Sequence, residues 1–379
     1  MKRDQRGFTL IELMVALVVS SLLVGMILAI FSRMSIAYRG QQQIAGVQQV
    51  LAAARATIEF DAKQAGFGLP QGFVFAGDLK LHPAVSITNS STGPDQIAFF
   101  YADSSAQALV TSTAWGTTLN VDDASSFAIG DLVVVSTADL SLSGLGPNDG
   151  NIAKYAACAL KVANKTSTSL SFTTVPPWGT PSESHCTALP NPSATSLVYK
   201  FVARGYRIDT TSAAQAAIGP LQLSTNGGLL GAGDTWNPLA FGFTDIQTSL
   251  QIFHQFSPAP WPAPGDTPDP DTDAVRDWYS GALQDTLTQP VLPAANTLDP
   301  KDGLLQISIS LVARTDRDVE GIATSLTPQL IDPLAPANNL LGDHAQVTLP
   351  SATDPALQGS RIYRYTTFQV DFRNLGVGR

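Results

Sequence analysis

The sequence predicts an α+β protein in which one long amino-terminal α-helix packs on a large, mainly antiparallel β domain. Three observations predict this fold. An apolar run at residues 8–31 begins the chain, no proline interrupts residues 1–69, and short β-forming runs between turn signals fill the rest from Gly72 onward. The chain has 379 residues, which is long enough for one large domain or two.

The apolar run is long enough to cross a membrane. It carries one charge, Glu12, and residues 13–31 carry none. A helix over residues 8–31 would be about 36 Å long, and the hydrocarbon core of a bilayer is about 30 Å thick. A secretory signal peptide would be cleaved after its apolar run, at small residues, and no such site follows this one. We therefore interpret the segment as retained.

Basic residues around the apolar run indicate its orientation. Lys2, Arg3 and Arg6 precede the run and favour a cytoplasmic amino terminus. Arg33 and Arg39 lie on its far side and weaken this inference.

Glu12 is unusual in a plain membrane anchor, because an ionised carboxylate deep in a bilayer costs about 2–3 kcal/mol. In one interpretation, Glu12 lies near the interface and its carboxylate reaches the headgroups. In the other, it pairs with a cation from another chain. Cleavage after Gly7 would create such a cation, the amine of Phe8, four residues before Glu12.

The stretch from Gly7 to Glu12, GFTLIE, follows basic residues and precedes the apolar run. In this context it resembles the prepilin signature of type IV pilins and type II secretion pseudopilins. The resemblance implies that residues 1–7 are a leader on the cytoplasmic side. A prepilin peptidase would cleave after Gly7 and methylate the amine of Phe8, and Glu12 would then help to recruit the subunit into a filament.

The helix is expected to continue past the membrane, so that residues 8–66 form one element with an amphipathic half at 32–66. Residues spaced three or four apart form one apolar stripe: Ile44, Val47, Leu51, Ala54, Ile58 and Ala65. Four charged residues lie largely off this stripe: Arg55, Glu59, Asp61 and Lys63. Gly66 and Pro70 supply a left-handed cap and a stop.

Residues 67–379 are expected to form the extracytoplasmic β-rich domain, which could divide into two sub-units near residues 210–220. The candidate strands are 96–101, 118–121, 132–137, 157–162, 169–174, 197–208, 221–223, 240–256, 304–314 and 363–372. Residues 258–273 are rich in proline and aspartate and indicate a surface loop or linker, and 274–287 could form a short helix.

The second half of the chain resembles the PilW family of minor pilins, with looser motifs. The matching stretches occur in a consistent order at 241–253, Trp278, 304–314 and 365–374. The resemblance implies a minor pilin that joins other minor pilins in a complex that starts pilus assembly and stays at or near the tip.

Cys158 and Cys186 are the two cysteines, and they belong to no metal-binding spacing. In an oxidising compartment they could form a disulfide, which would stabilise the fold by roughly 3–4 kcal/mol in the chain-entropy model. The alternative is two separate buried thiols.

The sequence contains no recognisable catalytic motif, and we expect neither an enzyme nor a cofactor. We interpret all the histidines as loop or surface residues: His82, His185, His254 and His344. Three tryptophans could form a sugar- or protein-binding surface, although they are more often core or loop anchors: Trp236, Trp261 and Trp278.

Asp269, Asp271 and Asp273 alternate along one loop and are a weak candidate for a Ca²⁺ site. Ala274 stands where an EF-hand loop needs glycine, so a solvated acidic loop is the simpler interpretation.

The net charge of −9 argues against a nucleic-acid surface. The two resemblances together imply a minor pilin anchored in the inner membrane with a periplasmic domain, later located at the pilus tip on the cell surface. The resemblance also implies a connection with twitching motility and cell adhesion. The expected partners are prepilin peptidase, other minor pilins and the major pilin, and a tip adhesin could join them. A type II secretion pseudopilin is the nearest alternative. A membrane-anchored periplasmic binding protein or adhesin is the second, and it leaves Gly7 and Glu12 without a role.

Overall fold

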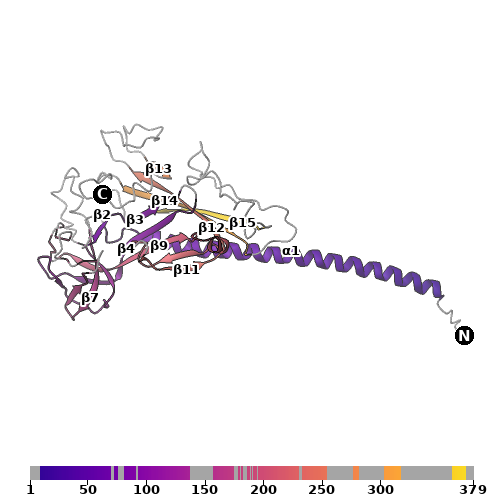
Figure 1. The fold of residues 1–379 in the computed structure, drawn as a ribbon, viewed down its shortest axis with the longest axis horizontal. Helices are drawn as coiled ribbons and strands as arrows, with labels where there is room; N and C mark the ends of the chain where they lie inside the picture. The colour runs from indigo at the N-terminus through magenta and orange to yellow at the C-terminus, as the bar shows by residue number, and fades with distance from the viewer. Residues whose placement is uncertain are drawn as a thin grey trace, which may run out of the picture.

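The structure of the chain is a computed structural model (Figure 1). It describes residues 9–69, 72–75, 81–90, 93–136, 157–174, 178–179, 181, 186–187, 189, 191–193, 195–229, 233–253, 276–280, 303–316 and 361–372.

A single helix, α1 (Leu10–Gln64), projects far beyond a β-rich head (Figure 1). It begins at Thr9, whose extended backbone and side chain cap the first turn. It ends beside Gly66, which adopts a left-handed φ of 81°, as expected for a glycine that terminates a helix. The expected helix is therefore confirmed to within two residues at each end.

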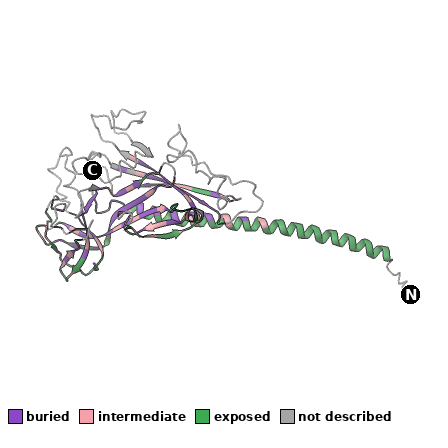
Figure 2. Cartoon of the chain, viewed as in Figure 1, coloured by how far each residue is buried: buried purple, intermediate pink, exposed green. Residues whose placement is uncertain are grey.

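The two halves of α1 differ in burial (Figure 2). Every residue from Leu10 to Ser35 is exposed. Farther along, the predicted stripe packs into the head, where Val47, Leu51 and Ile58 are buried. The second half of the helix is therefore the half that joins the head.

One charged residue departs from the predicted pattern. Arg55, Glu59 and Lys63 do lie outside the core, and Glu59 pairs with the other two at 3.3 and 2.6 Å. Asp61, however, is buried with only 5% of its surface exposed. It faces the β domain, so the expectation that it lies off the buried stripe was wrong.

Among the described residues, the first sheet has eleven strands. Its strands are β1 (Phe73–Phe75), β2 (Leu81–His82), β3 (Val85–Thr88), β4 (Gln96–Leu109), β5 (Thr118–Asn120), β6 (Leu132–Ser136), β7 (Ala157–Lys165), β8 (Ser169–Phe172), β9 (Leu197–Ile208), β10 (Leu221–Ser224) and β11 (Trp236–Ala240). The main order is β11-β10-β9-β6-β7-β1-β2, and β4 pairs with both β9 and β3. The β5–β8 pair joins through β7. A short helix, α2 (Ala213–Ile218), connects β9 to β10.

The second sheet, as far as the chain is described, has four strands in the order β13-β12-β14-β15. They are β12 (Phe243–Phe253), β13 (Arg276–Ser280), β14 (Gly303–Arg314) and β15 (Tyr363–Asp371), all antiparallel. The change of sheet comes between β11 and β12, later in the chain than the division considered near 210–220. Residues 276–280 form a strand, so the short helix expected over 274–287 was wrong there.

The main core lies where α1 meets both sheets. Alternate residues of β12 and β14, such as Ile246 and Ile309, point toward the helix, as the period of two in a strand requires. They join Val47, Leu51 and Ile58 of α1 and Tyr206 of β9 in one buried cluster. This cluster fixes the head on the helix and confirms the predicted fold class.

Candidate assembly site

The described chain begins at the first turn of α1, where Thr9 and Glu12 form a capping box. The Thr9 amide and hydroxyl both donate to Glu12 Oε2, at 3.0 and 2.9 Å, and the Glu12 amide donates to Thr9 Oγ1 at 3.3 Å. These bonds satisfy amide groups that a helix start otherwise leaves unpaired, and a carboxylate here also suits the helix dipole.

The capping box places the carboxylate of Glu12 on the surface of the first helical turn. Residues 1–8 lie outside the described part of the chain, so the structure gives no geometry for Gly7 or Phe8. Glu12 remains exposed and able to accept further hydrogen bonds, since a carboxylate has about four acceptor positions. The arrangement can therefore bind a cation or an amine while it caps its own helix.

The apolar surface behind Glu12 is fully uncovered. α1 is long and apolar enough to cross a membrane, and in the described part of the chain none of its most apolar stretch is buried. The hydroxyls of Ser20 and Ser21 donate hydrogen bonds to carbonyls of the same helix. Ser20 donates to the Ala16 carbonyl at 2.7 Å, and Ser21 donates to that of Val18 at 2.8 Å. Their polar groups are thus satisfied without water, as a lipid or helix-packed environment requires.

At the other end of α1, Asp61 accepts two hydrogen bonds from the head. Tyr101 of β4 donates to Oδ1 at 2.7 Å, and Tyr206 of β9 donates to Oδ2. Burial, together with the charge and hydrogen bond of Asp61, raises the pKa of both phenols well above their ordinary value. Both tyrosines therefore stay protonated and act as donors. Sequence analysis did not single out either tyrosine.

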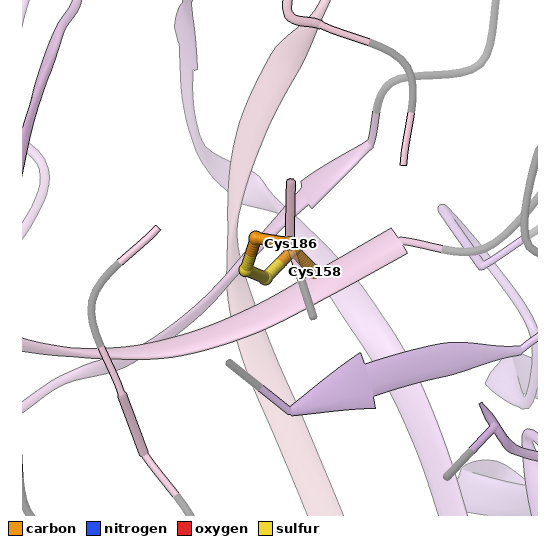
Figure 3. The surroundings of a disulfide bond; sticks show 2 residues. All are labelled: Cys158 and Cys186. Atoms are coloured by element: carbon orange, nitrogen blue, oxygen red, sulfur yellow. A yellow bond between two sulfur atoms is a disulfide. The ribbon is translucent and has the colours of Figure 1, made fainter. Parts of the chain in front are cut away.

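The structure joins Cys158 and Cys186 in a disulfide inside the head (Figure 3). Their Cα atoms lie 5.7 Å apart, within the usual range for such a bond, and both residues are fully buried. Cys158 belongs to β7, and Cys186 belongs to the connection between β8 and β9. The disulfide therefore holds part of this connection against the sheet.

The other candidate residues are dispersed. His82 lies in β2, buried and stacked on Phe73 with ring centroids 5.2 Å apart, so its interpretation as a loop or surface residue was wrong. The guanidinium carbon of Arg207 lies over the ring of Trp236, 4.3 Å from the ring centroid. The remaining residues lie outside the described part of the chain, or their side chains do: His185, His254, His344, Trp261, Trp278, Asp269, Asp271 and Asp273. Within the described ranges, no group of three or more His, Cys, Asp or Glu side chains could hold a metal ion.

Comparisons with known proteins agree with the amino-terminal signature. Residues 2–28 match the family model described as the prokaryotic N-terminal methylation motif. No curated protein matches the chain. A type IV-like pilin from Thermus thermophilus is similar in structure, with 13% identity, a TM-score of 0.37 and coverage of 86% of this chain and 97% of that one. The methylation motif on a long apolar helix supports a type IV pilin-like protein, in the broad class that includes pilins and pseudopilins.

Proposed function

We propose that the chain is a minor pilin, similar to the PilW family, that helps to initiate type IV pilus assembly and stays at or near the tip. The methylation motif implies processing by a prepilin peptidase and assembly with other pilins. In this proposal, the enzyme cleaves after Gly7 and methylates Phe8. The anchored precursor has its amino terminus in the cytoplasm and its head in the periplasm.

The observation that carries the proposal is the uncovered apolar half of α1 with Glu12 in its first turn. Such a surface is stable only in lipid or against other apolar helices. A buried carboxylate needs a cationic partner, and the amine of Phe8 in a neighbouring subunit would supply one. The same apolar half of α1 would therefore be covered by lipid before assembly and by neighbouring helices in the filament.

The size of the head supports a terminal position over a repeating one. A compact domain formed by residues 67–379 would be on the order of 50 Å across. Packed helices lie about 8–10 Å apart. Heads of this width would crowd one another if every subunit carried one, whereas a single copy above the last turn meets no such clash. The partners would be other minor pilins below it, the major pilin of the shaft and, at the tip, an adhesin.

The test is the position and copy number of the protein in isolated pili. Gold-labelled antibody against the head should mark one filament end, and quantitative mass spectrometry should give far fewer copies than the major pilin. Labelling along the whole shaft at near-equal stoichiometry would contradict the proposal.

A type II secretion pseudopilin remains the second candidate, because the methylation motif serves both systems. Deleting the gene separates the two. Loss of surface pili with normal protein secretion fits the minor pilin, and the reverse fits the pseudopilin.

A further inference from the structure

Three exposed apolar side chains lie on two segments that meet at the end of α2 and the end of β11. Ile218, Leu239 and Phe241 have 49%, 40% and 56% of their surfaces exposed. The Gly242 amide donates to the Ile218 carbonyl at 3.0 Å, and the Phe243 amide donates to that of Gly219 at 2.9 Å. These bonds bring the end of α2 beside Phe241. We call Ile218, Leu239 and Phe241 the apolar shelf.

The apolar shelf is rigidly supported. Ser212 caps α2 by accepting from the Gln215 amide at 3.2 Å, and Gly219 ends the helix in a left-handed conformation. A Cβ on Gly219 would collide with the carbonyl of Phe243, so the close contact requires glycine. Phe243 is fully buried and belongs to the core cluster. A surface already held in place loses little conformational entropy when a partner binds.

The segments that carry the shelf contribute no charge of their own, although Arg207 stacks on Trp236 and Asp209 accepts hydrogen bonds from Thr211 and Gln222. Residues 210–223 and 235–244 contain no charged side chain, although the whole chain carries a net charge of −9. Depletion of charge is typical of the centre of a protein–protein interface. Six large apolar side chains outside α1 are exposed in the described part of the chain, and the shelf holds three of them.

Side chains, not backbone, would make the contact here. Among the described strands, β11 pairs only with β10, so its other edge is an outer edge of the sheet. Pro238 lacks an amide hydrogen, and a register shift leaves Leu239 without a partner in β10. Both features make an edge unsuitable for pairing with a strand from another chain.

The location of the shelf excludes the membrane and points to another subunit. β11 contacts α1 (Figure 1), and Ala240 packs against the core cluster whose α1 residues begin at Val47. Burial of α1 begins earlier, at Gly40, which lies nine residues after Phe31, or about 14 Å along the helix. The headgroup layer extends only about 5–8 Å beyond the hydrocarbon core. A neighbouring helix packed on α1 would lie about 8–10 Å away and would bring its own subunit to the shelf.

We propose that the apolar shelf is the surface on which a neighbouring pilin-type subunit docks when α1 packs into the filament. The inference rests on the proposed role in assembly and names the part of the head that takes part in it. The partner presents an uncharged apolar surface and approaches along the same side of the helix.

Site-specific photocrosslinking in cells that assemble pili tests the docking surface. The full-length chain carries p-benzoylphenylalanine in place of Phe241, or in place of Ile129 as the matched control. Ile129 is 65% exposed, and the next residue, Gly130, bonds to β7 in the part of the head farthest from the amino terminus (Figure 1). Position 241 should give a covalent adduct with a subunit whose amino-terminal peptide begins with a methylated residue, at about tenfold the yield from position 129.

A second measurement uses Phe241→Ser and Ile129→Ser. Phe241→Ser should lower recovery in sheared pili about tenfold with normal leader cleavage, and Ile129→Ser should not. Adducts with lipid, adducts within the same chain, or equal yields from both positions would overturn the docking surface. If both serine variants are recovered normally while Glu12→Ala is not, the shelf is wrong and the assembly role stands.

Discussion

The buried carboxylate of Asp61 should be the main polar anchor between α1 and the head. Replacing it with alanine leaves the hydroxyls of Tyr101 and Tyr206 without their acceptor, and these tyrosines are only 7% and 0% exposed. A buried donor that loses its partner costs about 1–3 kcal/mol, so two cost about 2–6 kcal/mol. For a chain of 379 residues the midpoint of thermal unfolding should fall by about 3–8 °C.

The assay is thermal unfolding of the full-length chain in detergent micelles, followed by circular dichroism. Glu59→Ala is the matched control. Glu59 lies two residues before Asp61, about half a helical turn away, and the ion pairs described for it are on the surface. Such pairs contribute about 0–1 kcal/mol. Asp61→Asn should fall between the two, since the amide keeps one acceptor oxygen. If Asp61→Ala unfolds at the same temperature as Glu59→Ala, the hydrogen bonds from Tyr101 and Tyr206 to Asp61 do not hold the helix to the head.

Four further predictions follow from the described geometry and from the motif. Gly7→Val should block leader cleavage, so that the protein stays as full-length precursor in the inner membrane; normal processing would argue against the prepilin interpretation. Glu12→Ala should be inserted and cleaved but recovered poorly in filaments, and unchanged recovery would exclude the pairing role. Alkylation of the denatured, non-reduced protein should find no free thiol at Cys158 or Cys186, and labelled thiols would refute the disulfide. The raised pKa of Tyr206 means that the folded state keeps a proton that the unfolded chain loses above about pH 10. Stability should therefore fall as the pH rises above 10, with a shallower slope in Tyr206→Phe, as measured by urea unfolding.

The sequence predicted those helices and strands that are determined by residues close to one another in the chain. The stop at Gly66 needed only a glycine in the left-handed region, and the strand over 197–208 has the bounds expected from its β-forming residues. Residues 276–280 show the limit of this approach. Their strand exists because it pairs with β12, and such tertiary pairing overrides a weak helical pattern.

Asp61 could not have been assigned from its neighbours. A charged residue near the end of a helix usually faces water, and its two donors lie 40 and 145 residues away in the sequence. The helix spacing that located the apolar stripe carries no information about partners on distant strands. The same holds for the apolar shelf, which forms because backbone bonds join α2 to the residues after β11.

The unbroken course of α1 has a mechanical consequence. The helix runs from Leu10 to Gln64 without a break and is about 80 Å long. The head is attached to its last turns by the hydrophobic core and by the hydrogen bonds that Asp61 accepts from Tyr101 and Tyr206. Because the helix is continuous, a displacement of the membrane segment along the helix axis would move the head by the same distance. Each residue withdrawn from the bilayer lifts the head by about 1.5 Å. An axial pull on the filament would load the junction at Asp61 in shear, where the buried contacts of several strands share the force.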